Sequence, residues 1–204
     1  MVAIIDYGVG NLFSLRSSFG MIDVEAAVTG DPGVIRRADR IILPGVGAFE
    51  DAARKLRTAG LDDLLREEAR SGKYIMGICL GMQLLFDRSY EFGCHEGLSL
   101  IPGEVVDMTP DIPSALKVPH IGWNALHLTR PDHPLFRYIQ PNDCVYFVHS
   151  FYATRCDDAV LATAEYGKEL TAAVGLDNIL GCQFHPEKSG PVGLNILRAF
   201  CEMR

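Results

Sequence analysis

The stretch Tyr74-Ile-Met-Gly-Ile-Cys-Leu-Gly-Met-Gln-Leu-Leu-Phe86 decides the fold, because a short apolar run ends at a glycine-flanked cysteine and continues with a helical pattern. Gly77-Ile78-Cys79-Leu80-Gly81 matches the nucleophile elbow G-x-S-x-G, with cysteine in place of serine. A strand that turns sharply into a helix strains the residue at the apex, and flanking glycines allow close backbone approach. The pattern predicts that Cys79 points toward a helix N-terminus, where partial positive charge favours the thiolate. The alternative is a buried, inert cysteine between incidental glycines.

Apolar runs and helical patterns alternate through the first half of the chain. The run Val2 to Asp6 leads to Asn11, a good helix N-cap, and then to apolar residues at helical spacing up to Gly20, which is placed to end that helix. This alternation predicts an α/β fold with an open, mostly parallel, flavodoxin-like central sheet and helices on both faces. Further strands are expected at residues 24–28, 40–43 and 74–78, and further helices at about 49–56 and 61–72.

The second half contains short strands, turns and many prolines. We interpret it as an antiparallel or mixed extension of the same sheet, so one domain spanning residues 1–204 is expected. Pro191 is expected to begin a C-terminal helix. In such a sheet the site lies at the carboxyl ends of the strands, where the Cys79 elbow is placed. The expected strands of this half are residues 105–108, 144–148, 161–164, 171–174 and 179–184.

A thiol nucleophile needs a base, and Gln183-Phe-His-Pro-Glu187 contains the strongest candidate. The stretch follows an apolar strand, and residues two apart in extended chain face the same way. His185 and Glu187 are therefore expected to project together, so that the carboxylate orients the ring while its other nitrogen faces the sulfur of Cys79. Taken alone, His185 also suits a strand-end histidine bonded to backbone.

Acyl chemistry further needs N–H donors for a tetrahedral oxyanion. The Leu80 amide, directly after the nucleophile, is one natural donor. The turn Pro44-Gly-Val-Gly47 offers another, although an ordinary β–α turn has the same composition. Neither this turn nor Tyr7-Gly-Val-Gly-Asn11 completes a phosphate-binding or dinucleotide-binding motif, so no cofactor is expected.

Composition argues against several classes of function. The chain has 204 residues, of which 48% are hydrophobic, and a net charge of −7, so no basic surplus exists for binding nucleic acid or an anionic membrane. No apolar run approaches the roughly 20 residues of a membrane span, and no secretory signal is evident. The six cysteines form no C-x-x-C pair, and Cys94-His95-Glu96 suits a turn better than a metal site. We therefore expect a cytoplasmic protein with reduced thiols and no bound metal.

These motifs resemble those of class I (triad) glutamine amidotransferases, in which Cys and His-x-Glu occur in this order. The narrower resemblance is to the glutaminase subunits of imidazole glycerol phosphate synthase, an enzyme of histidine biosynthesis, and it extends from residue 1 to the C-terminus. The stretches that carry it are Asp6-Tyr-Gly-Val-Gly-Asn11, Pro44-Gly-Val-Gly47, Gly77-Ile-Cys-Leu-Gly-Met-Gln83, Ile121-Gly-Trp-Asn124, Tyr146-Phe-Val-His-Ser150 and His185-Pro-Glu-Lys-Ser189.

The resemblance implies a role for each residue of the site. Cys79 would attack the side-chain amide of glutamine and form a γ-glutamyl thioester. His185 would protonate the departing ammonia and then activate water, while Glu187 would orient His185. Phe151 stands where the family often has tyrosine, so the contact implied there is a backbone one. The residues implied to form the oxyanion hole are Gly45, Val46 and Leu80, and those implied to bind glutamine are Gln83, Glu91, Ser150 and Phe151.

The resemblance also implies a partner, a (β/α)8-barrel cyclase subunit. It would receive the ammonia and make imidazole glycerol phosphate and aminoimidazole carboxamide ribonucleotide. The chain carries no nucleotide motif, which agrees with acceptor chemistry on another polypeptide. Trp123 lies between Gly122 and Asn124, which suggests a surface loop. Candidates for the partner face are Asn11, Ser14, Trp123, Tyr146 and Lys188.

Three rival functions stay open at this level. The chain could serve another amidotransferase, for example in anthranilate or pyridoxal phosphate synthesis, although Asp6 to Asn11 and Ile121 to Asn124 argue against it. It could be a cysteine hydrolase that acts alone on peptide or γ-glutamyl bonds. It could also be a non-enzymatic binding or redox-sensing module, which the combination of Cys79, His185 and Glu187 disfavours.

Overall fold

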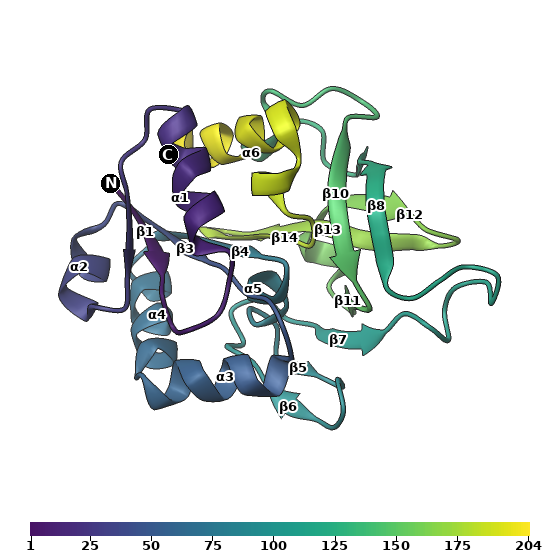
Figure 1. Cartoon of the computed structure of the whole chain (residues 1–204), viewed down its shortest axis with the longest axis horizontal. Coiled ribbons are helices and arrows are strands. Elements are labelled where there is room, and N and C mark those ends of the chain that lie inside the picture. Colours follow the sequence, from purple (N-terminus) through teal and green to yellow (C-terminus); the bar gives the residue numbers. More distant parts are fainter.

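An eight-stranded sheet crosses the centre of the molecule (Figure 1). The computed structural model describes residues 1–204. The strand order is β2-β1-β3-β4-β14-β13-β12-β9, in which the pairings from β2 to β14 are parallel and the others antiparallel. The predicted parallel sheet with an antiparallel extension is therefore confirmed. The strands are β1 (Val2–Ile5), β2 (Ala26–Thr29), β3 (Arg40–Leu43), β4 (Tyr74–Ile78), β9 (His127–Leu128), β12 (Val160–Glu165), β13 (Glu169–Leu176) and β14 (Ile179–Cys182).

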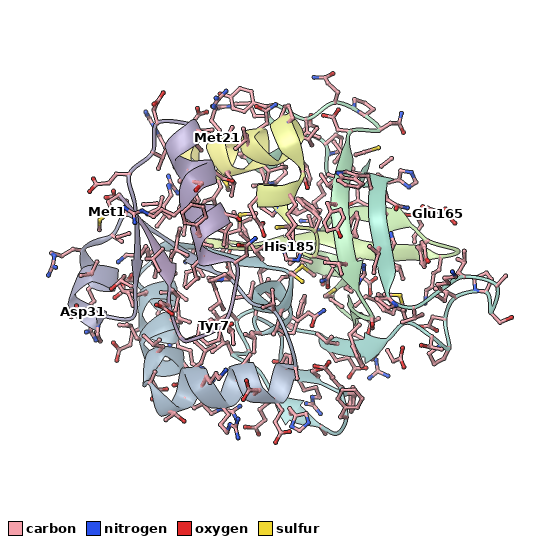
Figure 2. The ribbon with its side chains drawn as sticks, in the orientation of Figure 1. Met1, Tyr7, Met21, Asp31, Glu165 and His185 are labelled. Atoms are coloured by element: carbon pink, nitrogen blue, oxygen red, sulfur yellow. The ribbon has the colours of Figure 1, made fainter.

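Helices cover both faces of this sheet, because its strands are apolar on both sides. In β1, Ala3 and Ile5 belong to one core cluster, while Val2 and Ile4 belong to the other. The first core lies under α2, α3 and α4, and the second under α1 and α6. Figure 2 shows the side chains that fill these layers. No helix has the length and apolar character needed to cross a bilayer. The helices are α1 (Leu12–Met21), α2 (Pro32–Arg37), α3 (Phe49–Thr58), α4 (Leu61–Arg70), α5 (Leu80–Gln83) and α6 (Gly190–Glu202).

The first two helices differ from expectation. Asn11 occupies the N-cap of α1 but makes no side-chain capping bond, and its backbone angles are not those of a good cap. Gly20 lies inside α1, which ends one residue later. Helix α2 was not predicted, because it is only six residues long. Its signal is nevertheless local, since Asp31 accepts a hydrogen bond from Val34 N at 2.9 Å and Pro32 follows as the first helical residue.

The second half builds more than an extension of the central sheet, so the predicted single sheet is wrong there. Strand β10 (Cys144–His149) pairs with β8 (His120–Ala125) in a separate ribbon, and after Ser150 the chain enters another sheet as β11. The predicted surface loop around Trp123 is likewise wrong, because Trp123 lies in β8 opposite Tyr146. Which sheet each of these strands joins depends on pairing between strands that are far apart in the sequence, as β8 and β10 are. The four-stranded sheet contains β5 (Arg88–Ser89), β6 (His95–Glu96), β7 (Glu104–Asp107) and β11 (Phe151–Thr154).

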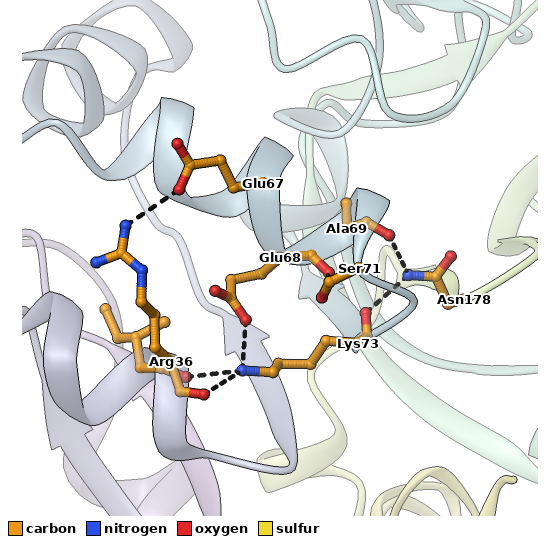
Figure 3. A network of polar contacts seen from close by, with 8 residues as sticks. Arg36, Glu67, Glu68, Ala69, Ser71, Lys73 and Asn178 are labelled. Carbon is orange, nitrogen blue, oxygen red and sulfur yellow. Dashed lines mark hydrogen bonds and ion pairs between the residues drawn. The ribbon is translucent and has the colours of Figure 1, made fainter.

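A polar cluster around Lys73, drawn in Figure 3, fixes the start of β4, whereas Cys79 follows the other end of that strand. Lys73 Nζ pairs with the Glu68 carboxylate and donates to the backbone oxygens of Ile35 and Arg36 at 3.1 and 2.9 Å. Asn178 Nδ2, just before β14, donates to Lys73 O at 2.8 Å. The Lys73 and Glu68 side chains are only 12% and 11% exposed, so breaking this pair would leave an uncompensated charge in a largely buried place.

Candidate active site

The carboxyl ends of β4 and β14 place the two most informative motifs side by side. The strands are parallel neighbours with Ile78 opposite Cys182, and Cys79 N donates to Cys182 O at 2.8 Å. The next residues along each strand therefore reach the same edge of the sheet. There Cys79 and His185 line one cavity of about 410 Å³. Its other lining residues are Val46, Gly47, Leu80, Gln83, Glu91, Phe92, Val148, His149, Ser150, Phe151 and Lys188.

Cys79 occupies the strained apex that the glycine spacing predicted. Its φ and ψ are 55° and −114°, a conformation that non-glycine residues rarely adopt. The flanking glycines are required sterically: a Cβ at Gly81 would lie 1.8 Å from Leu43 O, and one at Gly77 would lie 2.5 Å from Gly81 O. The helix that follows, α5, is a single turn of four residues and so shorter than the sequence pattern suggested. Support for a thiolate therefore depends on nearby side chains more than on a helix dipole.

His185 and Glu187 form a close, buried pair. His185 Nδ1 lies 2.8 Å from Glu187 Oε1, and the two side chains are 3% and 1% exposed. The pair is made across a 3-10 turn that Pro186 begins, and not along continuous strand. Burial alone would lower the pKa of His185, but interactions with Cys79 and with the Glu187 carboxylate raise that pKa to about 9. An imidazolium is thus held beside the cysteine at neutral pH, a partner that favours a thiolate.

The residues predicted to bind substrate all line the cavity, yet two of them also carry structural bonds. Gln83 Nε2 donates to Phe151 O at 3.1 Å and to Gln183 Oε1 at 3.0 Å. Glu91 Oε2 accepts from Phe49 N at 2.6 Å, and so satisfies an amide at the start of α3. These bonds fix the side chains in position. Ser150 reaches the cavity at the junction between β10 and β11.

Of the three residues predicted for an oxyanion hole, two line the cavity and one does not. Val46 and Leu80 line the cavity, whereas Gly45 is buried and does not line it. A Cβ at Gly45 would be 2.8 Å from Gly81 N, so only glycine allows this loop to pack against the elbow. Tyr7, which the sequence did not single out, donates from its hydroxyl to Pro44 O at 2.7 Å and thereby holds the same loop.

Gln183 is a further residue that sequence reasoning missed. It is fully buried, accepts the Gln83 bond, and its Nε2 lies 3.8 Å from Cys79 Sγ. The available signal was its position two residues before His185, which places both side chains on the same side of extended chain.

The predicted partner residues form two groups, and Lys188 is the one that lines the cavity. Trp123 is 64% exposed and packs on Tyr146 at a ring distance of 4.8 Å. Lys188 Nζ lies 5.6 Å from the Tyr146 ring and also lines the cavity. Asn11 and Ser14 are half-buried at the start of α1, the helix that contacts the turn containing Lys188.

The cysteines and histidines outside the cavity offer no further catalytic cluster. All six cysteines are free thiols. Burial raises the pKa of Cys156 and of Cys201, each to about 11, so both are protonated at neutral pH. No group of three or more His, Cys, Asp or Glu side chains is arranged to hold a metal ion, Cys94-His95-Glu96 included.

Comparison with known proteins agrees with this geometry. A family model for glutamine amidotransferase class-I matches residues 3–203. The imidazole glycerol phosphate synthase subunit HisH of Syntrophotalea carbinolica is 47% identical, and that of Carboxydothermus hydrogenoformans is 49% identical; both alignments cover 100% of each chain. The chain belongs to the HisH family of class I glutamine amidotransferases. The family predicted from the sequence motifs is therefore confirmed, as is the prediction that the chain is an enzyme.

Solved structures support the amidotransferase fold. A crystal structure of a glutamine amidotransferase superposes with a TM-score of 0.77 at 18% identity, covering 99% of this chain and 98% of that one. PurLQS from Thermotoga maritima superposes with a TM-score of 0.74 at 20% identity, covering 98% of this chain and 96% of that one. At such identities the likeness concerns the fold alone.

Proposed function

We propose that this HisH family member hydrolyses glutamine through a covalent intermediate on Cys79. The thiolate attacks the side-chain amide carbon, and the resulting oxyanion is stabilised by backbone N–H groups of Leu80 and of the Val46 loop. His185, charged at neutral pH, gives a proton to the amide nitrogen, so that ammonia leaves and a γ-glutamyl thioester forms. The neutral ring then takes a proton from water, which attacks the thioester and releases glutamate and the free cysteine.

The observation that carries this proposal is the buried His185–Glu187 pair beside a strained cysteine on one cavity wall. A carboxylate 2.8 Å from Nδ1 leaves the other ring nitrogen for the sulfur and keeps the ring charged. Gln83, Glu91 and the backbone of Ser150 and Phe151 are proposed to hold the glutamine head group, because they line the same cavity.

Membership of the HisH family makes the chain a glutaminase subunit of imidazole glycerol phosphate synthase, in histidine biosynthesis. We propose that a (β/α)8-barrel cyclase subunit binds it, receives the ammonia, and makes imidazole glycerol phosphate and aminoimidazole carboxamide ribonucleotide. Support comes from Trp123, which is 64% exposed and packs on the half-buried Tyr146, and from Lys188, which lies near the Tyr146 ring and lines the cavity, since exposed aromatic residues are typical of interface anchors. A cytoplasmic location is proposed as well, supported by six free cysteines.

The loop around Val46 is proposed to act as a switch. Val46 is 43% exposed and borders Gly47, whose φ of +92° is a conformation that favours glycine. The Val46 peptide, which glycines flank on both sides, can therefore rotate at little steric cost and direct its N–H into or away from the oxyanion position. We expect slow hydrolysis in the isolated chain and faster hydrolysis when the partner holds its ligand.

Glutamate release by the purified chain, alone and with the cyclase plus its ribonucleotide ligand, tests the proposal. The expected result is low activity alone, a large increase with the liganded cyclase, and none in Cys79→Ala. Equal turnover with and without the partner would contradict the switch and favour a cysteine hydrolase that acts alone. Activity in Cys79→Ala would contradict the mechanism.

A further inference from the structure

Two buried histidines that have no assigned role connect the cavity wall to β8. Strands β10 and β8 lie side by side (Figure 1), and His149 at the end of β10 lies opposite His120 at the start of β8. Their side chains meet through His149 Nε2 and His120 Nδ1 at 3.1 Å. At one end of this row of contacts, His149 Nδ1 lies 2.9 Å from Phe151 O. At the other, His120 Nε2 lies 2.9 Å from Asn124 Oδ1.

The groups at both ends of this row of contacts, Phe151 O and Asn124 Oδ1, are hydrogen-bond acceptors. The Phe151 carbonyl can only accept, and it also receives the Gln83 amide at 3.1 Å. The Asn124 amide has a fixed orientation, because its Nδ2 donates to Glu165 O at 2.9 Å and so turns Oδ1 toward His120. Figure 2 shows Glu165 at the edge of the molecule and His185, which lines the cavity, near its centre. The two imidazoles therefore stand in series between two oxygens that offer no proton.

The number of protons does not match the number of contacts. Three contacts need one proton each, whereas two neutral imidazoles carry two. Burial lowers the pKa of both rings, to about 4 for His149, so the pair is neutral near pH 7. The positive charge of His185 disfavours an additional proton on His149. The hydrogen bond to Asn124 favours an additional proton on His120. Only two of the three contacts can therefore be hydrogen bonds at a time.

The remaining surroundings restrict the rings without supplying a proton. His120 is stacked between Phe147 and Tyr166, with ring distances of 5.0 and 4.1 Å. His120 and His149 are 1% and 6% exposed. The rings therefore change tautomer and hydrogen-bond partner more readily than they change position.

We propose that His149 and His120 are positioning residues that couple Asn124 on β8 to the Phe151 carbonyl in the cavity wall. The inference rests on the proposed function, since it takes this cavity as the glutamine site. When His120 donates to Asn124, either the contact between the two rings or the contact between His149 and Phe151 O has no proton and is lost. When the Asn124 contact is released, His149 donates to Phe151 without competition. Since β8 also carries Ile121 and Trp123, which are 59% and 64% exposed, a molecule docked on this strand would act on the cavity wall through the pair.

Imidazole ¹⁵N NMR of the full-length chain, titrated with acid, tests the pair without any turnover. The variants Asn124→Asp and Asn124→Leu both lose the donor to Glu165 O and differ only in what they offer His120. A carboxylate favours the third proton, so the shared titration of His120 and His149 moves to higher pH, while leucine moves it to lower pH. Exposed His127 serves as the internal control. Shifts in the same direction in both variants, or independent titration of the two rings, would overturn the inference.

Kinetics with the liganded partner test the connection to the cavity. His149→Asn keeps an N–H donor for Phe151 O, whereas His149→Leu removes it. We expect KM for glutamine to rise about five- to tenfold in the leucine variant and less than about twofold in the asparagine variant, with kcat little changed in either. His127→Ala should match the wild type. Wild-type turnover in this assay tests the proposed function separately. The same KM in both His149 variants would refute the coupling.

Discussion

Replacing Glu187 with glutamine removes a charge from the site while preserving its shape. The amide oxygen of glutamine can accept the same 2.8 Å hydrogen bond from His185 Nδ1, in a place where both side chains are nearly inaccessible. Without the negative charge of Glu187, the imidazolium form of His185 is less favoured. Proton transfer by a positioned group contributes about 10²–10⁴-fold to a rate, and because orientation is retained we expect the lower end, a fall in kcat of about 10²-fold. That fall corresponds to about 2.7 kcal/mol in the barrier.

The assay is glutamate release as a function of pH, in the presence of the liganded partner. In the wild type the alkaline limb of kcat/KM reports loss of the His185 proton, and removing the carboxylate moves that limb to lower pH. KM should change by less than about threefold, because Glu187 does not line the cavity. Glu202→Gln, at an exposed carboxylate of α6, is the matched control. A Glu187→Gln variant with wild-type kcat and an unshifted pH profile would refute the assigned role of this pair.

The same pair makes stability depend on pH. Burial opposes the charge on His185, but Cys79 and Glu187 raise its pKa to about 9, above the roughly 6.5 of an unfolded histidine. The resulting stabilisation is fully present below pH 6.5 and is lost as pH rises through 9. At 1.36 kcal/mol per pKa unit it amounts to about 3 kcal/mol. Urea unfolding at pH 6 and pH 9.5 should show that the wild type loses more stability over this window than Glu187→Gln; equal losses would contradict the assignment.

Four further substitutions, two of them a matched glycine pair, test other parts of the structure. Gly81→Ala places a Cβ 1.8 Å from a backbone oxygen of β3 and should cost about 3 kcal/mol of stability or prevent folding. Gly20→Ala has no atom within 4 Å of the new Cβ and should stabilise α1 by about 0.5–1 kcal/mol. Thermal unfolding measures both effects. Lys73→Met leaves its carboxylate partner unpaired and should cost about 3–5 kcal/mol in urea unfolding, and a loss below about 1 kcal/mol would show that the cluster in Figure 3 matters little. Tyr7→Phe removes a tether of about 1 kcal/mol from the loop that carries Val46 and should raise basal glutamine turnover relative to partner-activated turnover; an unchanged ratio would argue against that tether.

The parts of the site that could be predicted from the sequence are those with a local cause. The elbow at Cys79 follows from glycines two residues away on either side, and the strand before it follows from an apolar run. The His185–Glu187 contact follows from short sequence separation at a strand end. Parallel order then brings the two motifs together, because neighbouring parallel strands end at the same edge.

The parts that could not be predicted depend on partners far apart in the chain. Tyr7 meets Pro44, and Gln183 meets both Gln83 and Cys79, through the packing of strands that are not adjacent in sequence. The separate β8–β10 ribbon was missed for the same reason. The run Cys144–Val148 in β10 is apolar or aromatic at every position, and such a run gives no local sign of the sheet that the strand joins.

The covalent intermediate on Cys79 can be trapped during turnover. The full-length chain, mixed with glutamine and the liganded partner and quenched with acid during turnover, is digested and analysed by mass spectrometry. We expect one glutamyl group attached to the peptide that contains Cys79, released by hydroxylamine as expected for a thioester, and absent from Cys79→Ala. Steady glutamate release with no adduct on that peptide, or with an adduct at another cysteine, would contradict the proposed mechanism.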